Sequence, residues 1–141
     1  MRYASALLIS LFLGACSRPP GPQFNLFLLE AKSLPADASL CISVDGSDFS
    51  ELALLQTEDA RFVSWRDCTR VADVAKGSFH TATGRPAYFI NLHHFKPGPA
   101  ATGEIEVDIY HHGSWAIHRR LAVTRADGAW AVSKVPSETQ A

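Results

Sequence analysis

Two stretches of alternating apolar and polar residues, 104–111 and 115–121, constrain the fold of this chain more than any other feature. A period of two residues is typical of a β-strand that buries one face. A three-residue loop at 112–114 places apolar residues opposite apolar ones, and charged residues opposite histidine or the opposite charge. The predicted cross-strand pairs are Ile109 with Ile117, Ile105 with Leu121, Asp108 with His118, and Glu106 with Arg120. The two stretches therefore predict an antiparallel hairpin with one apolar and one polar face.

Arg119 does not fit this pattern, because the same register places it on the apolar face opposite Val107. We therefore expect either a β-bulge at this point or a position of Arg119 near the edge of the sheet. After a turn at Asp127-Gly128, residues 129–135 supply a third strand, which completes a meander.

The preceding part of the chain alternates helical and strand patterns. The predicted elements are a helix over 23–33, a strand over 40–44, a helix over 48–58, and strands over 61–65 and 87–95. Asp48 and Glu51 have the spacing of a capping box at the start of the second helix. We predict an α+β fold, with two helices packed on one mostly antiparallel sheet that ends in a three-stranded meander. A small β-sandwich is the alternative.

The N-terminal segment has the composition of an export signal. Arg2 supplies positive charge, residues 4–13 form an apolar stretch, and the small residues Gly14 and Ala15 precede Cys16. Spanning a bilayer takes about 20 apolar residues, so this stretch is too short for a membrane helix.

The motif Leu13-Gly14-Ala15-Cys16 resembles the lipobox of bacterial lipoproteins. The resemblance implies cleavage before Cys16, diacylation of its thiol by chains such as palmitate, and usually acylation of the new amino group. Ser17 stands where an aspartate usually retains such proteins at the inner membrane, so the resemblance implies the outer membrane, facing the periplasm. The alternatives are a secretory signal cut after Ala15 and an uncleaved membrane helix.

Length and composition predict a single folded unit. The predicted organisation is a signal peptide over 1–15, a lipidated cysteine with a proline-rich tether over 16–22, a single globular α+β domain over 23–136, and a flexible tail over 137–141. The chain has 13 lysines and arginines against 14 aspartates and glutamates, so it lacks the basic field of a nucleic-acid-binding protein.

Cys41 and Cys68 are the cysteines that remain once Cys16 is lipidated. In an oxidising compartment they predict a structural disulfide, with two buried thiols as the alternative. The chain has no Cys-x-x-Cys motif that would indicate redox activity.

Six histidines, among them His93-His94, His111-His112 and His118, raise the question of a metal site. Adjacent residues on a strand point to opposite faces, so each pair would supply only one ligand to a given site. Neither Cys-x-x-Cys nor His-Glu-x-x-His spacing is present. We therefore predict no metal and no cofactor, and interpret these histidines as surface or strand-end residues.

His118 beside Asp108, with Ser114 near the turn, is the strongest candidate for hydrolase chemistry. The predicted register keeps Ser114 several residues from His118, and no Gly-x-Ser-x-Gly elbow is present. We therefore predict that the protein is not an enzyme.

The polar face of the hairpin is the candidate protein-binding face, and a solvated sheet face is the simpler alternative. Its members are Glu106, Asp108, His118 and Arg120. Location and size favour a non-enzymatic, lipid-anchored module that binds an envelope or imported protein, for example as an inhibitor or immunity protein. The alternative is a small-ligand-binding lipoprotein with a pocket between the helices and the sheet.

The ending Asp127-Gly128-Ala129-Trp130-Ala131-Val132 resembles the last hairpin of the cone-shaped sheets called nuclear transport factor 2-like. The wider layout, with one cysteine in the first strand and another after the second helix, is similar to small exported bacterial proteins of uncharacterised function. Neither resemblance implies an activity.

Overall fold

The computed structural model describes residues 21–140, with the backbone alone described for 134–140. The predicted signal peptide, Cys16 and most of the predicted tether lie outside these residues. The two α-helices, called the helices below, are α1 (Gln23–Ala31) and α2 (Leu52–Glu58), and η1 (Trp65–Asp67) is a single 3-10 turn. The strands are β1 (Ser39–Val44), β2 (Phe62–Ser64), β3 (Cys68–Thr69), β4 (Phe79–His80), β5 (Ala87–Pro97), β6 (Thr102–His112), β7 (Trp115–Ala126) and β8 (Ala129–Gln140). Within the described part of the chain, no helix is both long enough and apolar enough to cross a bilayer.

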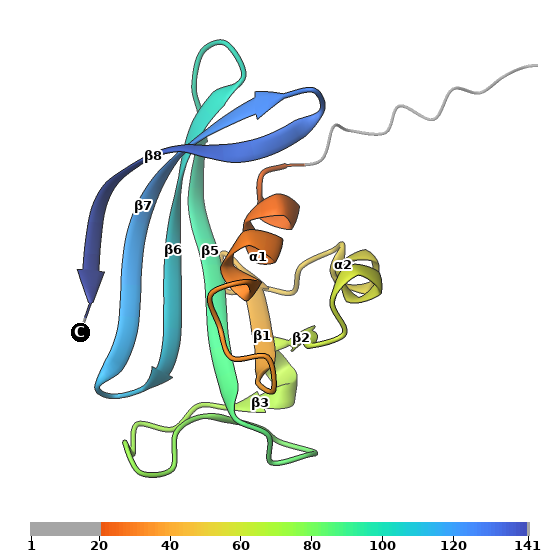
Figure 1. Cartoon of the computed structure of the whole chain (residues 1–141), viewed down its shortest axis with the longest axis vertical. Helices are drawn as coiled ribbons and strands as arrows, with labels where there is room; N and C mark the ends of the chain where they lie inside the picture. The colour runs from red at the N-terminus through yellow and green to blue at the C-terminus, as the bar shows by residue number, and fades with distance from the viewer. Residues whose placement is uncertain (1–20, 141) are drawn as a thin grey trace, which may run out of the picture.

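Six strands form one mixed sheet in the order β2-β1-β5-β6-β7-β8. β1 runs parallel to both β2 and β5, and the remaining pairs are antiparallel, so the sheet is largely antiparallel (Figure 1). β3 and β4 form a separate two-stranded sheet. Two helices and a largely antiparallel sheet agree with the predicted α+β class.

The predicted register of the central hairpin is confirmed. Ile109 pairs with Ile117, Ile105 with Leu121, Asp108 with His118, and Glu106 with Arg120. The loop is one residue shorter than predicted, because His112 pairs with Trp115 across a register shift that follows Tyr110. Two turn residues and a bulge therefore replace the three-residue loop.

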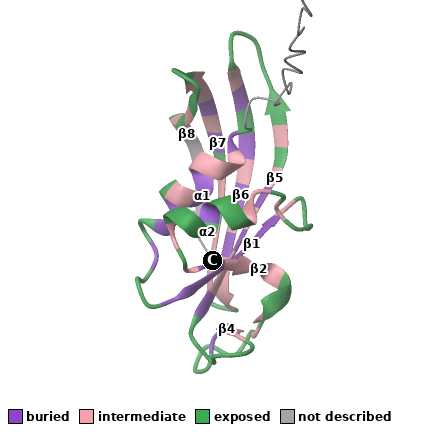
Figure 2. Cartoon of the chain, turned by 90° about the vertical axis from the view of Figure 1, so that its right-hand side faces the viewer, coloured by how far each residue is buried: buried purple, intermediate pink, exposed green. Residues whose placement is uncertain are grey.

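The core lies between the helices and one face of the sheet. On β6 the residues Ile105, Val107 and Ile109 are buried, and the alternate residues point to the other face. Phe27 of α1 and Leu55 of α2 belong to the same apolar cluster, so both helices cover this face. Figure 2 shows α1 and α2 together in front of the strands.

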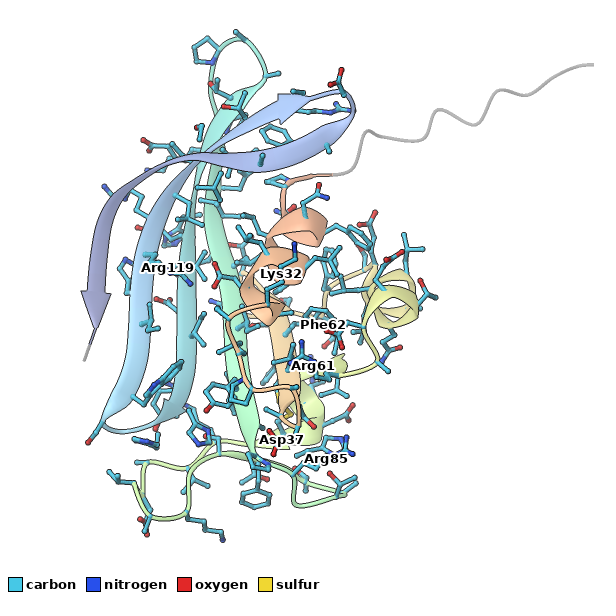
Figure 3. The ribbon with its side chains drawn as sticks, viewed as in Figure 1. Lys32, Asp37, Arg61, Phe62, Arg85 and Arg119 are labelled. Carbon is cyan, nitrogen blue, oxygen red and sulfur yellow. A yellow bond between two sulfur atoms is a disulfide. The ribbon has the colours of Figure 1, made fainter. Side chains whose placement is uncertain are left out.

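Arg119 lies on this buried face opposite Val107, in a regular part of the β6–β7 ladder and away from the sheet edge, where we expected a bulge or an edge position. Its guanidinium pairs instead with the carboxylate of Glu30, a buried residue of α1. Figure 3 places Arg119 on the sheet beside α1. The expectation was wrong because sequence alone does not show which charge on a helix faces a given strand position.

The predicted disulfide between Cys41 and Cys68 is present, with Cα atoms 6.3 Å apart. It attaches the segment that contains η1 and β3 to β1, on the face of that strand that points away from the helices. That segment therefore covers one end of the sheet face opposite the helices.

Two predictions at chain segments differ from the structure. Glu51 is the N-cap of α2 without a side-chain capping bond, and Asp48 contacts Ser64 and Arg66 instead, so the predicted capping box is wrong. β8 extends to Gln140, past the end of the predicted strand at residue 135. The pairing of β7 with β8 shifts register between Arg120 and Ala122. This shift lets the ladder pass Pro136, which has no N–H to donate.

Candidate functional site

The four residues of the predicted protein-binding face lie together on the sheet face opposite the helices. His118 on β7 contacts Asp108 on β6, with Nδ1 2.5 Å from Oδ1. Arg120 donates from its guanidinium to Oε1 of Glu106 at 3.3 Å. The cross-strand pairs expected from the register are therefore made by the side chains.

The structure adds His93 and His94 of β5 to this face. The pairing of β5 with β6 shifts register between His93 and Lys96, and His94 has a φ of +55°. Their ring centroids are 4.5 Å apart. The premise that adjacent histidines point to opposite faces was wrong here, because a bulge with a left-handed residue brings both rings to one side.

The imidazole of His93 stands between the two carboxylates of β6. Its Nδ1 lies 3.5 Å from Oε2 of Glu106, and its Nε2 lies 2.5 Å from Oδ2 of Asp108. The second contact lacks the direction of a hydrogen bond, since Nε2 is buried and makes none within the described part of the chain. His94 reaches the same Oε2 of Glu106 with its Nδ1 at 2.5 Å. We call His93, His94, Glu106, Asp108 and His118 the histidine–carboxylate cluster.

Glu106 is the electrostatic centre of this cluster. The hydrogen bond with His94 lowers the pKa of the Glu106 carboxyl, with further contributions from Arg120 and His93 that together exceed the opposing effect of burial. Glu106 is therefore an anion at neutral pH, with one oxygen on Arg120 and the other directed to the two histidines.

Asp45, in the turn after β1, holds the bulge in place. Its Oδ1 accepts a hydrogen bond from the backbone N–H of His94 at 3.1 Å, and its own N–H donates to the carbonyl of Leu92 at 2.9 Å. Asp45 has a φ of +50°, a conformation that a short polar residue tolerates better than most.

Next to the cluster, the same face carries a groove made of two adjoining depressions of about 310 and 390 Å³. Both are open to solvent, and both are lined by Arg70, Phe89 and Asn91. The first continues to Tyr110, Ala116 and His118, and the second to Ser43, Trp65 and Cys68. The disulfide-linked segment forms one wall, where the guanidinium of Arg70 lies 3.8 Å from the ring centroid of Tyr110.

Ser114 and His118 have separate hydrogen-bond partners. Within residues 21–140, no hydrogen bond joins Ser114 to His118. The backbone N–H of Ser114 donates instead to Nδ1 of His112 in the turn. His118 and Asp108 form a cross-strand pair.

The remaining histidines have separate local roles. The ring of His111 stacks on Tyr88 with centroids 4.4 Å apart, and its Nδ1 lies 2.8 Å from the carbonyl of Ala87. His80 pairs with Thr83 at 2.8 Å.

A third depression, of about 440 Å³, lies between α1 and β8. Leu28, Leu29 and Lys32 line it from the helix, and Trp130 and Val132 from the strand. Its position corresponds to the predicted alternative of a pocket between helices and sheet. The β7–β8 hairpin bends toward the start of α1 at this point (Figure 1), where the N–H of Trp130 donates to Oδ1 of Asn25.

Sequence reasoning identified Glu106, Asp108, His118 and Arg120 but missed His93 and His94 as members of this face. The available signal was a polar pair, His93-His94, in an apolar-rich strand, followed two residues later by Lys96-Pro97. A break in alternation of this kind is where a bulge is to be expected.

The chain has no significant match to a protein-family model, to a curated protein or to a solved structure.

Proposed function

We propose that this protein is a non-enzymatic, lipid-anchored module of the bacterial cell envelope that binds a protein partner through the sheet face opposite its helices. The observation that carries the proposal is the groove on that face, with its partly exposed aromatic rings and arginines. Trp65, Phe89 and Tyr110 supply the rings, and Arg66 and Arg70 the guanidinium groups.

This composition suits a protein partner more than a small molecule. Tyrosine, tryptophan and arginine are enriched among the residues that dominate binding energy at protein interfaces. A small-molecule site, in contrast, buries most of its ligand, and both depressions of the groove are open. The histidine–carboxylate cluster borders the groove and adds charged groups at its rim, where they favour orientation of a partner.

The cellular location rests on the motif Leu13-Gly14-Ala15-Cys16 and on the disulfide. A disulfide between Cys41 and Cys68 suits an oxidising compartment such as the periplasm. Several acyl chains on Cys16 hold a protein firmly at a bilayer, because each buried CH₂ contributes about 0.8 kcal/mol. Ser17 favours the outer membrane, because lipoproteins retained at the inner membrane usually have an aspartate at the position after the lipidated cysteine.

A small-ligand-binding lipoprotein is the second candidate. The depression between α1 and β8 favours it, because leucines and the ring of Trp130 line a largely apolar hollow there. An apolar ligand would contact this hollow from the side of the helices and would leave the groove free.

Crosslinking followed by affinity purification from the native envelope tests the proposed function. The full-length protein is compared with Tyr110→Ala and Arg70→Ala, and with Leu54→Ala on the exposed surface of α2 as the matched control. Loss of an interface residue that contributes about 2 kcal/mol weakens binding roughly 30-fold, so recovery of a stoichiometric partner drops sharply with the two groove variants. Equal recovery with all variants contradicts the assignment of the groove.

The anchor is tested separately by fractionation of cells that produce Cys16→Ser. We expect the wild-type protein in the membrane fraction and the variant in the soluble fraction, since the variant lacks the acylated thiol. A variant that still sediments with membranes contradicts the lipid anchor without affecting the assignment of the groove.

A further inference from the structure

The histidine–carboxylate cluster brings together the side chains that transition metals bind, although no spacing motif in the sequence indicates a metal. Two groups of three converge within 4.8 Å: His93, His94 and Glu106 on one side, and His93, Asp108 and His118 on the other. His93 belongs to both groups because its two ring nitrogens face opposite ways. A neutral imidazole has one lone pair for a metal and one N–H, so it ligates an ion on one side only.

We propose that His93, His94 and Glu106 form a binding site for one divalent transition-metal ion of the zinc type. The ligand atoms are Nδ1 of both histidines and Oε2 of the glutamate. Two nitrogen ligands and one carboxylate oxygen suit zinc and its neighbours, since imidazole and carboxylate are ligands of intermediate softness.

The separations between these atoms fit coordination. Ligands at 2.0–2.1 Å from a tetrahedral zinc ion are about 3.3 Å from one another. Nδ1 of His93 lies 3.2 Å from Nδ1 of His94 and 3.5 Å from Oε2 of Glu106. Nδ1 of His94 is closer to Oε2, at 2.5 Å, and this pair would open by less than an ångström to admit an ion.

The tautomers of the two histidines decide whether these three atoms share a proton or bind a cation. Nδ1 of each histidine carries a lone pair when the ring holds its proton on Nε2, and these two lone pairs then face the same point as Oε2 of Glu106. A divalent cation accepts a lone pair from all three. His94 is the exposed member, with 67% of its side chain accessible, so the site keeps an open position toward solvent.

The surrounding residues occupy the positions of outer-shell partners. Arg120 holds the second oxygen of Glu106, and Asp45 holds the backbone of His94. Asp108 contacts the other nitrogen of His93 and is itself bonded to His118. A carboxylate that accepts from the far nitrogen of a metal-bound histidine orients the ring and raises its basicity, and Asp108 is placed to take this role once Nε2–H of His93 points at Oδ2. These outer-shell roles favour a metal ion on the Glu106 side of His93 over one on the Asp108 side.

Calorimetric titration of the full-length, detergent-solubilised protein with ZnCl₂ tests the site, using protein made without a polyhistidine tag. We expect saturable binding of one ion per chain with a dissociation constant below about 10 μM. His94→Ala and Glu106→Gln each weaken binding by at least about 10-fold, which is the lower limit for removing even an outer-shell partner. His80→Ala is the matched control, because His80 lies on β4 outside the cluster and leaves the affinity unchanged.

Histidine side-chain ¹⁵N spectra supply a readout that does not depend on substitution. Addition of Zn²⁺ shifts the Nδ1 resonances of His93 and His94 and leaves Nδ1 of His118 in place. The absence of saturable Zn²⁺ binding overturns the proposal. Binding that survives His94→Ala and Glu106→Gln but is lost with Asp108→Asn and His118→Ala overturns the ligand set.

Discussion

Arg119 is a charged residue on the buried face of the sheet, where its partner Glu30 is 2% exposed and Arg119 itself is 19% exposed. Sequence alternation placed Arg119 on this face but gave no partner for it. The partner lies 89 residues earlier in the chain, and only the packing of α1 on β7 brings the two together. Long-range pairing of this kind leaves no local pattern in a sequence.

Removal of one member of this ion pair is expected to destabilise the protein strongly. Arg119→Met takes the guanidinium away from a buried carboxylate and should lower the free energy of unfolding by about 3–5 kcal/mol, measured by urea denaturation. The double variant Glu30→Met/Arg119→Met should recover most of this loss, because both charges are then gone.

The neighbouring residue provides the control for this experiment. Arg120→Met removes an exposed guanidinium from the opposite face, and such pairs contribute about 0–1 kcal/mol. A loss of under about 1 kcal/mol for Arg119→Met would contradict the structural role assigned to the buried pair.

At the scale of secondary-structure elements, sequence periodicity predicted the β6–β7 hairpin with its register, and it located both helices. It failed where backbone geometry departs from a regular ladder. The bulge at His94 depends on Asp45, which lies 49 residues earlier and bonds the His94 backbone. The parallel pairing of β1 with β5 likewise depends on topology and has no signature in either strand.

The disulfide is the covalent link between the first strand and the segment that forms one wall of the groove. In the chain-entropy model a loop of 27 residues contributes about 3.5 kcal/mol. Cys41→Ser/Cys68→Ser should therefore lower the unfolding temperature clearly, as measured by circular dichroism. Alkylation of two thiols in the unreduced, denatured protein, detected by intact mass, would contradict the bridge.

At the scale of the whole molecule, the two faces of the sheet have different roles. One face and both helices enclose the core, and the other carries the groove and the histidine–carboxylate cluster. The sequence predicted the polar residues of β6 and β7 on this second face because alternation separates polar from apolar side chains. It could not predict the groove, since the wall formed by residues 65–72 depends on the disulfide and on the bond from Tyr110 to the carbonyl of Val71.

Site-specific photocrosslinking in the native envelope is the most direct test of the claim that this second face binds a protein. A photoreactive residue is placed at Ala116 in the groove and, in a second strain, at Leu54 on α2. We expect a discrete protein adduct from position 116 and none from position 54. An adduct from position 54 alone, or identical patterns from both positions, would contradict the assignment of the binding face.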